Sequence, residues 1–219
     1  MNKMRTALAC LTLGAVAISG TAGAQQAAAS FFVTSTGSGS GGWFGGLQGA
    51  DMLCQTLATA AGSGGKTWRA YLSTSATGST PAVNARDRIG KGPWQNVKGV
   101  VIAKDLAELH GSNNITKQTG LTEKGTVVNG FGDTPNQHDI LTGSQPDGTA
   151  IAGNDDKSCG NWTKNGEGSA MAGHVDRTGT NPNPVANASW NSSHGTAGCS
   201  VDLLAKTGSA GYIYCFAPN

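Results

Sequence analysis

Histidines and carboxylates are the residues of this chain whose types could support acid–base chemistry. The four histidines are widely spaced, and the sequence contains no H-E-x-x-H or G-x-S-x-G motif; they are His110, His138, His174 and His194. His138 and Asp139 are adjacent, but neighbouring residues on a strand point to opposite faces. We therefore expect His138 to be a surface histidine rather than one member of an acid–base pair.

A second group that could do chemistry is acidic. Asp155, Asp156 and Glu167 could supply the pair of carboxylates that glycoside hydrolysis needs. The segment around them is rich in glycine, and such a loop is a poor frame for carboxylates that must be held at a fixed separation. The sequence therefore predicts a protein that is not an enzyme, with a glycan hydrolase as the less favoured alternative.

The cysteines indicate a structural role. The chain has five, and Cys10 lies in a segment with the features of an export signal, which leaves an even number. Four cysteines in an oxidising compartment predict two disulfides. No C-x-x-C pair is present and the spacings are long, which disfavours a cysteine zinc site.

The amino-terminal 24 residues resemble a signal peptide. Lys3 and Arg5 precede an apolar stretch at 7–18 that is too short to span a bilayer as a helix. An A-x-A cleavage signal at 22–24 places the cut near Ala24. We therefore expect a signal peptide at 1–24, a short extension at 25–30 and one domain at 31–219. The protein would be secreted, periplasmic or on the cell surface, without membrane insertion.

Removing the signal also removes the net charge. The full chain has 15 basic and 13 acidic residues, and loss of Lys3 and Arg5 leaves 13 of each. Nucleic-acid binding requires an excess of Lys and Arg that neutralises phosphates. The sequence therefore argues against nucleic acid as a partner.

The elements that position these residues are short. Residues 31–36, 66–74, 96–103, 138–144 and 211–217 have the composition of strands. Apolar residues three or four apart predict a helix from Leu47 to Ala61, ended by Gly62, and 104–110 suits one or two helical turns. Residues 145–211 are mostly Gly, Asn, Ser, Thr, Asp and Pro, which is typical of a long loop region. Such a loop in a compact domain needs a covalent constraint.

Four cysteines allow three pairings. A terminal strand frays unless it is tied down, and a bond from Cys215 to Cys54 would lock the last strand to the first helix. A bond from Cys159 to Cys199 would pin the loop region. We therefore favour the nested pairing Cys54–Cys215 with Cys159–Cys199.

Motifs in a fixed order resemble the C-type-lectin-like fold, and most closely its endostatin-like branch with exported bacterial relatives. They extend over nearly all of 31–219 and are "GADMLCQ" (49–55), "WRAYLS" (68–73), "RIGKGPW" (88–94), "TGSQPDG" (142–148), "CGNW" (159–162) and "YCF" (214–216). The resemblance implies an α+β fold with small mixed antiparallel sheets, one or two helices, a long loop region and two nested disulfides. Endostatin can carry zinc through histidines near its amino end, but this chain has none before 110.

The resemblance also implies a calcium and sugar site. Many galactose-type C-type lectins use a Gln-Pro-Asp triplet and a later W-N-D for calcium, which takes six to eight oxygen ligands. The candidate metal ligands here are Gln145, Asp147, Asp155 and Asn191, and Trp190 would be a ligand-binding neighbour. Position 192 is Ser where the motif has Asp, and Pro-Asp-Gly is also a common turn sequence. For Trp190 itself, the favoured interpretation is a core residue.

These observations favour an exported, non-catalytic binding module. Its loop region 142–199 would recognise a glycan or an extracellular protein, with Ca²⁺ as a candidate cofactor. The alternative is a structural or adhesive surface protein of the same fold that has no small-molecule site.

Overall fold

The computed structural model describes residues 1, 28–153 and 155–218 of the chain. The expected signal peptide and its cleavage site at Ala24 lie outside these residues. The domain begins before residue 31, because Ala29 and Ser30 are already buried and Ala217 donates a backbone hydrogen bond to Ser30.

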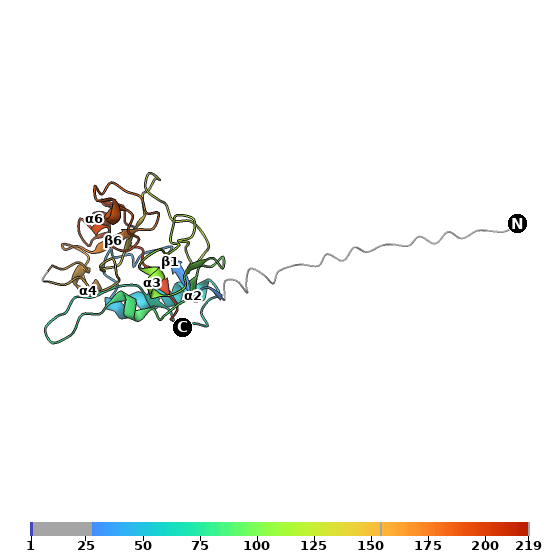
Figure 1. Cartoon of the computed structure of the whole chain (residues 1–219), viewed down its shortest axis with the longest axis horizontal. Coiled ribbons are helices and arrows are strands. Elements are labelled where there is room, and N and C mark those ends of the chain that lie inside the picture. Colours follow the sequence, from blue (N-terminus) through green and yellow to red (C-terminus); the bar gives the residue numbers. More distant parts are fainter. Residues whose placement is uncertain (2–27, 154, 219) are drawn as a thin grey trace.

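The described residues form a mixed α+β structure with small antiparallel sheets (Figure 1). The helices are α2 (Gly46–Ala60), η1 (Ala85–Arg88, a 3₁₀ helix), α3 (Leu106–Leu109), α4 (Cys159–Trp162), α5 (Pro184–Asn187) and α6 (Val201–Ala205). The strands are β1 (Phe31–Val33), β2 (Arg69–Ala70), β3 (Trp94–Gln95), β4 (Val101–Ala103), β5 (Asp139–Leu141), β6 (Met171–His174), β7 (His194–Gly195) and β8 (Tyr214–Phe216). Five α-helices in this part of the chain exceed the one or two expected, but four of them are single turns.

The first sheet brings the two ends of the domain together. Strand β8 lies between β1 and β2 and is antiparallel to both, with Phe32 opposite Cys215 and Ala70 opposite the same cysteine. The last strand is therefore central in its sheet.

This sheet separates two hydrophobic cores. Because side chains alternate along a strand, Phe32 and Cys215 face the core beneath α2, while Phe31 and Tyr214 face the second core. Tyr71, which follows β2, is fully buried in that second core, whereas Arg69 within β2 is exposed.

Both predicted disulfides are present. Cys54–Cys215 joins α2 to β8 across 161 residues, and Cys159–Cys199 closes a loop of 40 residues. The nested pairing is therefore confirmed.

Helix α2 also agrees with the predicted helix, because its buried residues Ala50, Cys54 and Ala58 recur every four positions and Gly62 follows with a φ of 82°.

Two other predictions need correction. Residues 96–103 are not one strand, because 96–100 form the turn that connects β3 to β4 and Asn96 accepts two backbone hydrogen bonds within it. Residues 145–211 are not all loop, because they contain β6, β7 and three short helices. These strands have two to four residues and little apolar content, so they lack the alternation by which strands are recognised.

The third sheet, in the order β5-β6-β7, positions the candidate site. It joins the first sheet through a parallel bridge between Leu141 and Ile213. Gly173 at the centre of β6 allows the chain at Trp190 to approach closely, since a Cβ there would lie 2.0 Å from the Trp190 carbonyl oxygen. Figure 1 shows β6 and α6 together, away from α2.

Candidate metal centre

Three histidines surround one aspartate at the edge of the third sheet. Asp139 on β5 pairs directly with His174 on β6, so the two side chains lie on the same face. His194 on β7 is opposite Ala172, two residues from His174, and therefore shares that face as well. His138 directly precedes β5.

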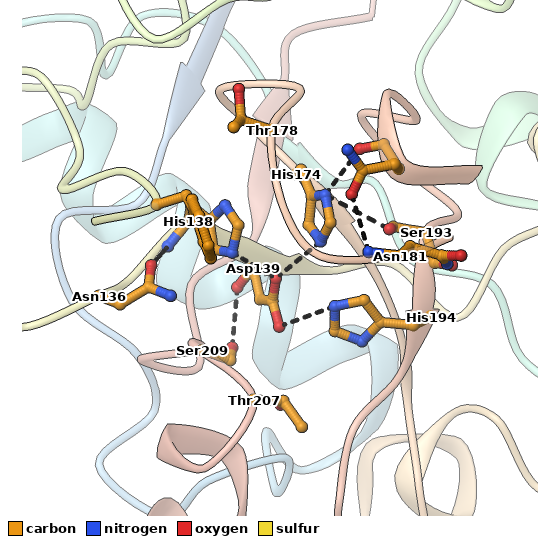
Figure 2. Close-up of polar contacts among 12 residues, drawn as sticks. Asn136, His138, Asp139, His174, Thr178, Asn181, Ser193, His194, Thr207 and Ser209 are labelled. Atoms are coloured by element: carbon orange, nitrogen blue, oxygen red, sulfur yellow. Dashed lines mark hydrogen bonds and ion pairs between the residues drawn. The ribbon is translucent and has the colours of Figure 1, made fainter. Parts of the chain in front are cut away.

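The ring nitrogens point at the Asp139 carboxylate (Figure 2). Nε2 of His138 is 3.3 Å from Oδ1 of Asp139, and Nε2 of His174 is 3.4 Å from the same oxygen. Nε2 of His194 is 3.5 Å from Oδ2. One ligand atom from each of His138, Asp139 and His174 lies within 4.8 Å of the other two, and all three residues are buried.

The other nitrogen of each ring faces a hydrogen-bond acceptor. Nδ1 of His138 is 2.9 Å from Oδ1 of Asp176, and Nδ1 of His174 is 2.7 Å from the carbonyl oxygen of Asn187. Nδ1 of His194 is 3.2 Å from the carbonyl oxygen of Gly195. Histidines that bind metals usually donate their second N–H to a carboxylate or a backbone carbonyl in this way.

Asp176 is itself fixed in place. Its Oδ2 accepts the Phe131 amide at 2.6 Å, and Gly130 permits this approach because a Cβ there would lie 2.6 Å from the same oxygen. Although burial opposes the shift, hydrogen bonds from His138 and from the Phe131 backbone lower the pKa of Asp176. The carboxylate is therefore ionised, and Nδ1 of His138 donates to it.

These hydrogen bonds determine where the lone pairs lie. A carbonyl oxygen can only accept, so Nδ1 of His174 donates, and in a neutral ring Nε2 then carries a lone pair. Burial lowers the pKa of His174 below that of an exposed histidine, which favours the neutral ring. Contact with the Asp139 carboxylate raises the pKa of His194.

Asp139 and Nε2 of His174 are therefore acceptors that face one another, whereas the raised pKa of His194 favours a protonated ring whose Nε2 is 3.5 Å from Asp139. Both carboxylate oxygens of Asp139 and Nε2 of His174 are buried without a hydrogen-bond partner among the described residues. Asp139 is 0% exposed and His174 is 1% exposed. Buried polar groups are normally paired, and an unpaired buried carboxylate is strongly unfavourable. A cation between the rings and the carboxylate would satisfy these atoms together.

The donor set and spacing fit zinc or a similar transition metal. Zinc bonds to histidine nitrogen and carboxylate oxygen are about 2.0–2.2 Å long, which places two ligands of a tetrahedral site about 3.3–3.6 Å apart. The three nitrogen–oxygen separations fall in that range, but the ligand atoms that all lie within 4.8 Å of one another belong to His138, Asp139 and His174, and His194 is outside this group. Imidazole with carboxylate suits zinc, iron, copper and nickel, whereas calcium takes oxygen ligands.

A pocket of about 760 Å³ opens above the rings. His138, His174 and His194 line it, whereas Asp139 lies behind them. The remaining lining residues come from three loops, from β7 and from the end of α6; they are Phe131, Asn136, Gly179, Thr180, Asn181, Pro182, Gly195, Ala205, Lys206, Thr207 and Gly208. The histidine face of the cluster is therefore the side that a ligand could reach.

The expectation that His138 is a surface histidine was wrong. His138 is 2% exposed, and it lies just before β5, where the strand rule that separates neighbouring side chains does not apply. The sequence offered one signal for this site: three of its four histidines fall between 138 and 194. His110 lies elsewhere, where its Nε2 is 2.8 Å from the hydroxyl of Tyr71.

The residues predicted to bind calcium are only partly brought together. Asn191 is 1% exposed, and its amide donates to the hydroxyl of Tyr71 and to the carbonyl oxygens of Gln145 and Pro146. Oδ1 of Asp147 accepts the amide and hydroxyl of Thr149, which lowers the pKa of Asp147. Calcium binding here stays a prediction, and it would require these oxygens to exchange internal partners for the ion.

Asp155 and Trp190 lie apart from that turn. Asp155 lines a separate pocket with Asp156, which is engaged by the backbone amides of Ser158 and Gly160. Trp190 is 3% exposed, and its ring packs against Tyr71 and Tyr214 in the second core. Of the two interpretations of Trp190, the core residue is correct, so its side chain is not presented to a ligand.

Comparisons with known proteins do not assign the chain to a family. No protein-family model matches it, and a search of curated proteins finds no significant match. Within the described residues, no helix has both the length and the apolar character needed to cross a membrane.

Proposed function

We propose that this protein is an exported, non-catalytic binding module whose site is a transition-metal centre formed by His138, Asp139, His174 and His194. The observation that carries the proposal is the convergence of three imidazole nitrogens, each 3.3–3.5 Å away, on a fully buried carboxylate whose oxygens have no partner with hydrogen-bond geometry among the described residues. A bound divalent ion would supply an electrophilic centre at the floor of the pocket.

The proposal keeps the loop region 142–199 as the recognition surface. His174 and His194 belong to it, as do the pocket-lining residues Thr180 and Asn181. The Cys159–Cys199 disulfide closes residues 159–199 of this region into a loop. A glycan or an extracellular protein that reaches the pocket would contact the region that the sequence analysis indicated, although at the histidines rather than at the 145–147 turn.

We propose further that the domain has the C-type-lectin-like fold. Three features support this: β1 and β8 pair so that the domain ends meet, the long disulfide ties α2 to β8, and the second disulfide is nested within the first.

The chemistry of the pocket supports binding rather than catalysis. A metal-assisted hydrolase needs a general base beside the ion in addition to the ligands. Apart from the histidines, the described lining residues include no Asp, Glu, Cys or Tyr. A structural protein remains the alternative, because four protein ligands are the arrangement of closed structural zinc sites.

Calorimetric titration of the metal-free protein with zinc tests the proposal. We expect one zinc per chain, and we expect His174→Gln to weaken binding by at least a hundredfold. His110→Gln is the matched control, since it removes a histidine outside the cluster. Native mass spectrometry checks the stoichiometry. Equal zinc affinity in both variants, or no zinc bound by the wild-type protein, would contradict the proposal.

A further inference from the structure

The pocket above the metal centre has a charge pattern that selects a class of ligand, and the inference below rests on the proposed function. Lys206, at the end of α6, is the only cationic side chain among the described lining residues apart from the histidines, and none of the lining residues is acidic. A divalent ion would add two positive charges, of which the Asp139 carboxylate balances one. The pocket therefore favours an anion.

The position open to such an anion is on the histidine side of the cluster. His138, Asp139 and His174 form the compact group, while the side chain of His194 is 30% exposed at the rim. Zinc sites with three firmly held ligands keep a position that accepts an exchangeable donor, and four-coordinate zinc can expand to five. The three rings line the pocket, so the exchangeable donor would come from within it.

The walls of the pocket add a second requirement. Phe131 is 44% exposed, and its ring centre is 5.7 Å from that of His138. Thr180 and Lys206 line the pocket with side chains that have no hydrogen-bond or ion-pair partner within the part of the chain that the structure describes. One exposed aromatic ring with a few unpartnered polar groups suits a ligand that has both an apolar face and hydroxyls.

We propose that this pocket binds the carboxylate of a sugar acid. One carboxylate oxygen is the exchangeable donor to the metal, the ammonium of Lys206 pairs with the anionic group, and the sugar ring packs against Phe131. A carboxylate can satisfy the metal and a lysine at once because it has two oxygens and accepts charge-assisted hydrogen bonds. The volume of about 760 Å³ is within the range of small-molecule sites.

The test uses the cobalt-substituted protein, because the visible absorption of Co²⁺ reports its coordination. Glucuronate is titrated beside glucose, which lacks the carboxylate, and acetate, which lacks the ring. We expect glucuronate to change the cobalt spectrum and to bind at least tenfold more tightly than acetate, while glucose leaves the spectrum unchanged. Lys206→Gln should weaken glucuronate binding about fivefold, the value of one exposed charge pair.

The variants separate the two parts of the proposal. Phe131→Ala should weaken glucuronate binding and leave acetate binding unchanged, and Lys104→Gln is the control for removing an exposed lysine. Equal affinities for acetate and glucuronate would show that the sugar ring is not recognised. Tighter binding of a peptide carboxylate than of glucuronate would show that the ligand is not a sugar acid. A cobalt spectrum that glucuronate does not change would overturn this inference and leave the metal site intact. Absence of cobalt binding would instead refute the proposed function.

Discussion

Replacing Asp139 by asparagine should change the free energy of unfolding in opposite directions with and without zinc. In the metal-free protein the Asp139 carboxylate is 0% exposed and neither oxygen has a hydrogen-bond partner among the described residues. An unsatisfied buried polar group costs about 1–3 kcal/mol. The asparagine amide is uncharged, has nearly the same shape and can donate to Nε2 of His174. The metal-free variant should therefore be more stable than the wild-type protein by about 1–3 kcal/mol.

With zinc bound, the wild-type protein should instead be more stable than Asp139→Asn. A ligand at a hundred times its dissociation constant stabilises the state that binds it by about 2.7 kcal/mol. For a domain of this size, 1 kcal/mol corresponds to about 2–4 °C in the melting temperature. Zinc should thus raise the wild-type melting temperature by about 5–10 °C, and it should have almost no effect on Asp139→Asn because the only anionic ligand is lost.

The measurement is thermal melting by circular dichroism after chelation and again with zinc. Asp202→Asn on α6 is the control, because it removes an exposed carboxylate near the pocket without altering the cluster. The competing explanation is an ion pair between Asp139 and a protonated histidine. In that case the variant would be less stable than the wild-type protein in the metal-free state, and zinc would shift both proteins equally; this pair of results would refute the metal centre.

Three further predictions concern the rest of the domain. Replacing Cys54 and Cys215 together by serine should lower the free energy of unfolding by up to about 5 kcal/mol, the loop-entropy value for 161 residues, as measured by urea unfolding. Asp51→Asn should cost about 3 kcal/mol in the same assay, because Asp51 pairs with two arginines and is 9% exposed, whereas the exposed Asp87→Asn should cost little. Millimolar calcium should leave the melting temperature unchanged, because Oδ1 of Asp147 accepts two hydrogen bonds from Thr149 and the Asn191 amide is engaged by Tyr71 and the turn; a rise that Asp147→Asn abolishes would establish the calcium site instead.

The elements that could be predicted from the sequence are those determined by local periodicity or by the small number of possible cysteine pairings. Helix α2 is one, because its apolar residues recur at helical spacing up to Gly62. The disulfide pairing is another, because only a few pairings exist and the terminal strand with Cys215 required an anchor. Both follow from residues that are close in sequence or few in number.

The metal centre could not be predicted in that way. Its four residues come from β5, β6, β7 and the residue before β5, and their meeting depends on the pairing of strands that have two to four residues. The local sequence at His174 and His194 is glycine-rich and carries no strand pattern. The rule that separates His138 from Asp139 held only for residues inside a strand, and His138 is outside one.

The calcium hypothesis failed to gain support for a related reason. The Gln-Pro-Asp triplet does form a turn beside Asn191, as the motif implied, so the placement of those residues was correct. The side chains nevertheless bond to the turn itself and to Tyr71, which a sequence motif does not reveal. A motif places residue types near one another, whereas the hydrogen-bond partners of each oxygen decide whether an ion can bind.

The location of the metal centre has a physical rationale in the distribution of the cores. The two hydrophobic clusters lie around the first sheet, where α2, Trp68 and Trp94 are buried. Strands β6 and β7, with the sequences MAGH and HG, contribute few large apolar side chains, and short strands without such support are marginal. The Cys159–Cys199 disulfide constrains one side of this region. A metal ion that joins β5, β6 and β7 through four side chains would constrain the other side, so the same ion that presents a binding position would also hold the surface that surrounds it.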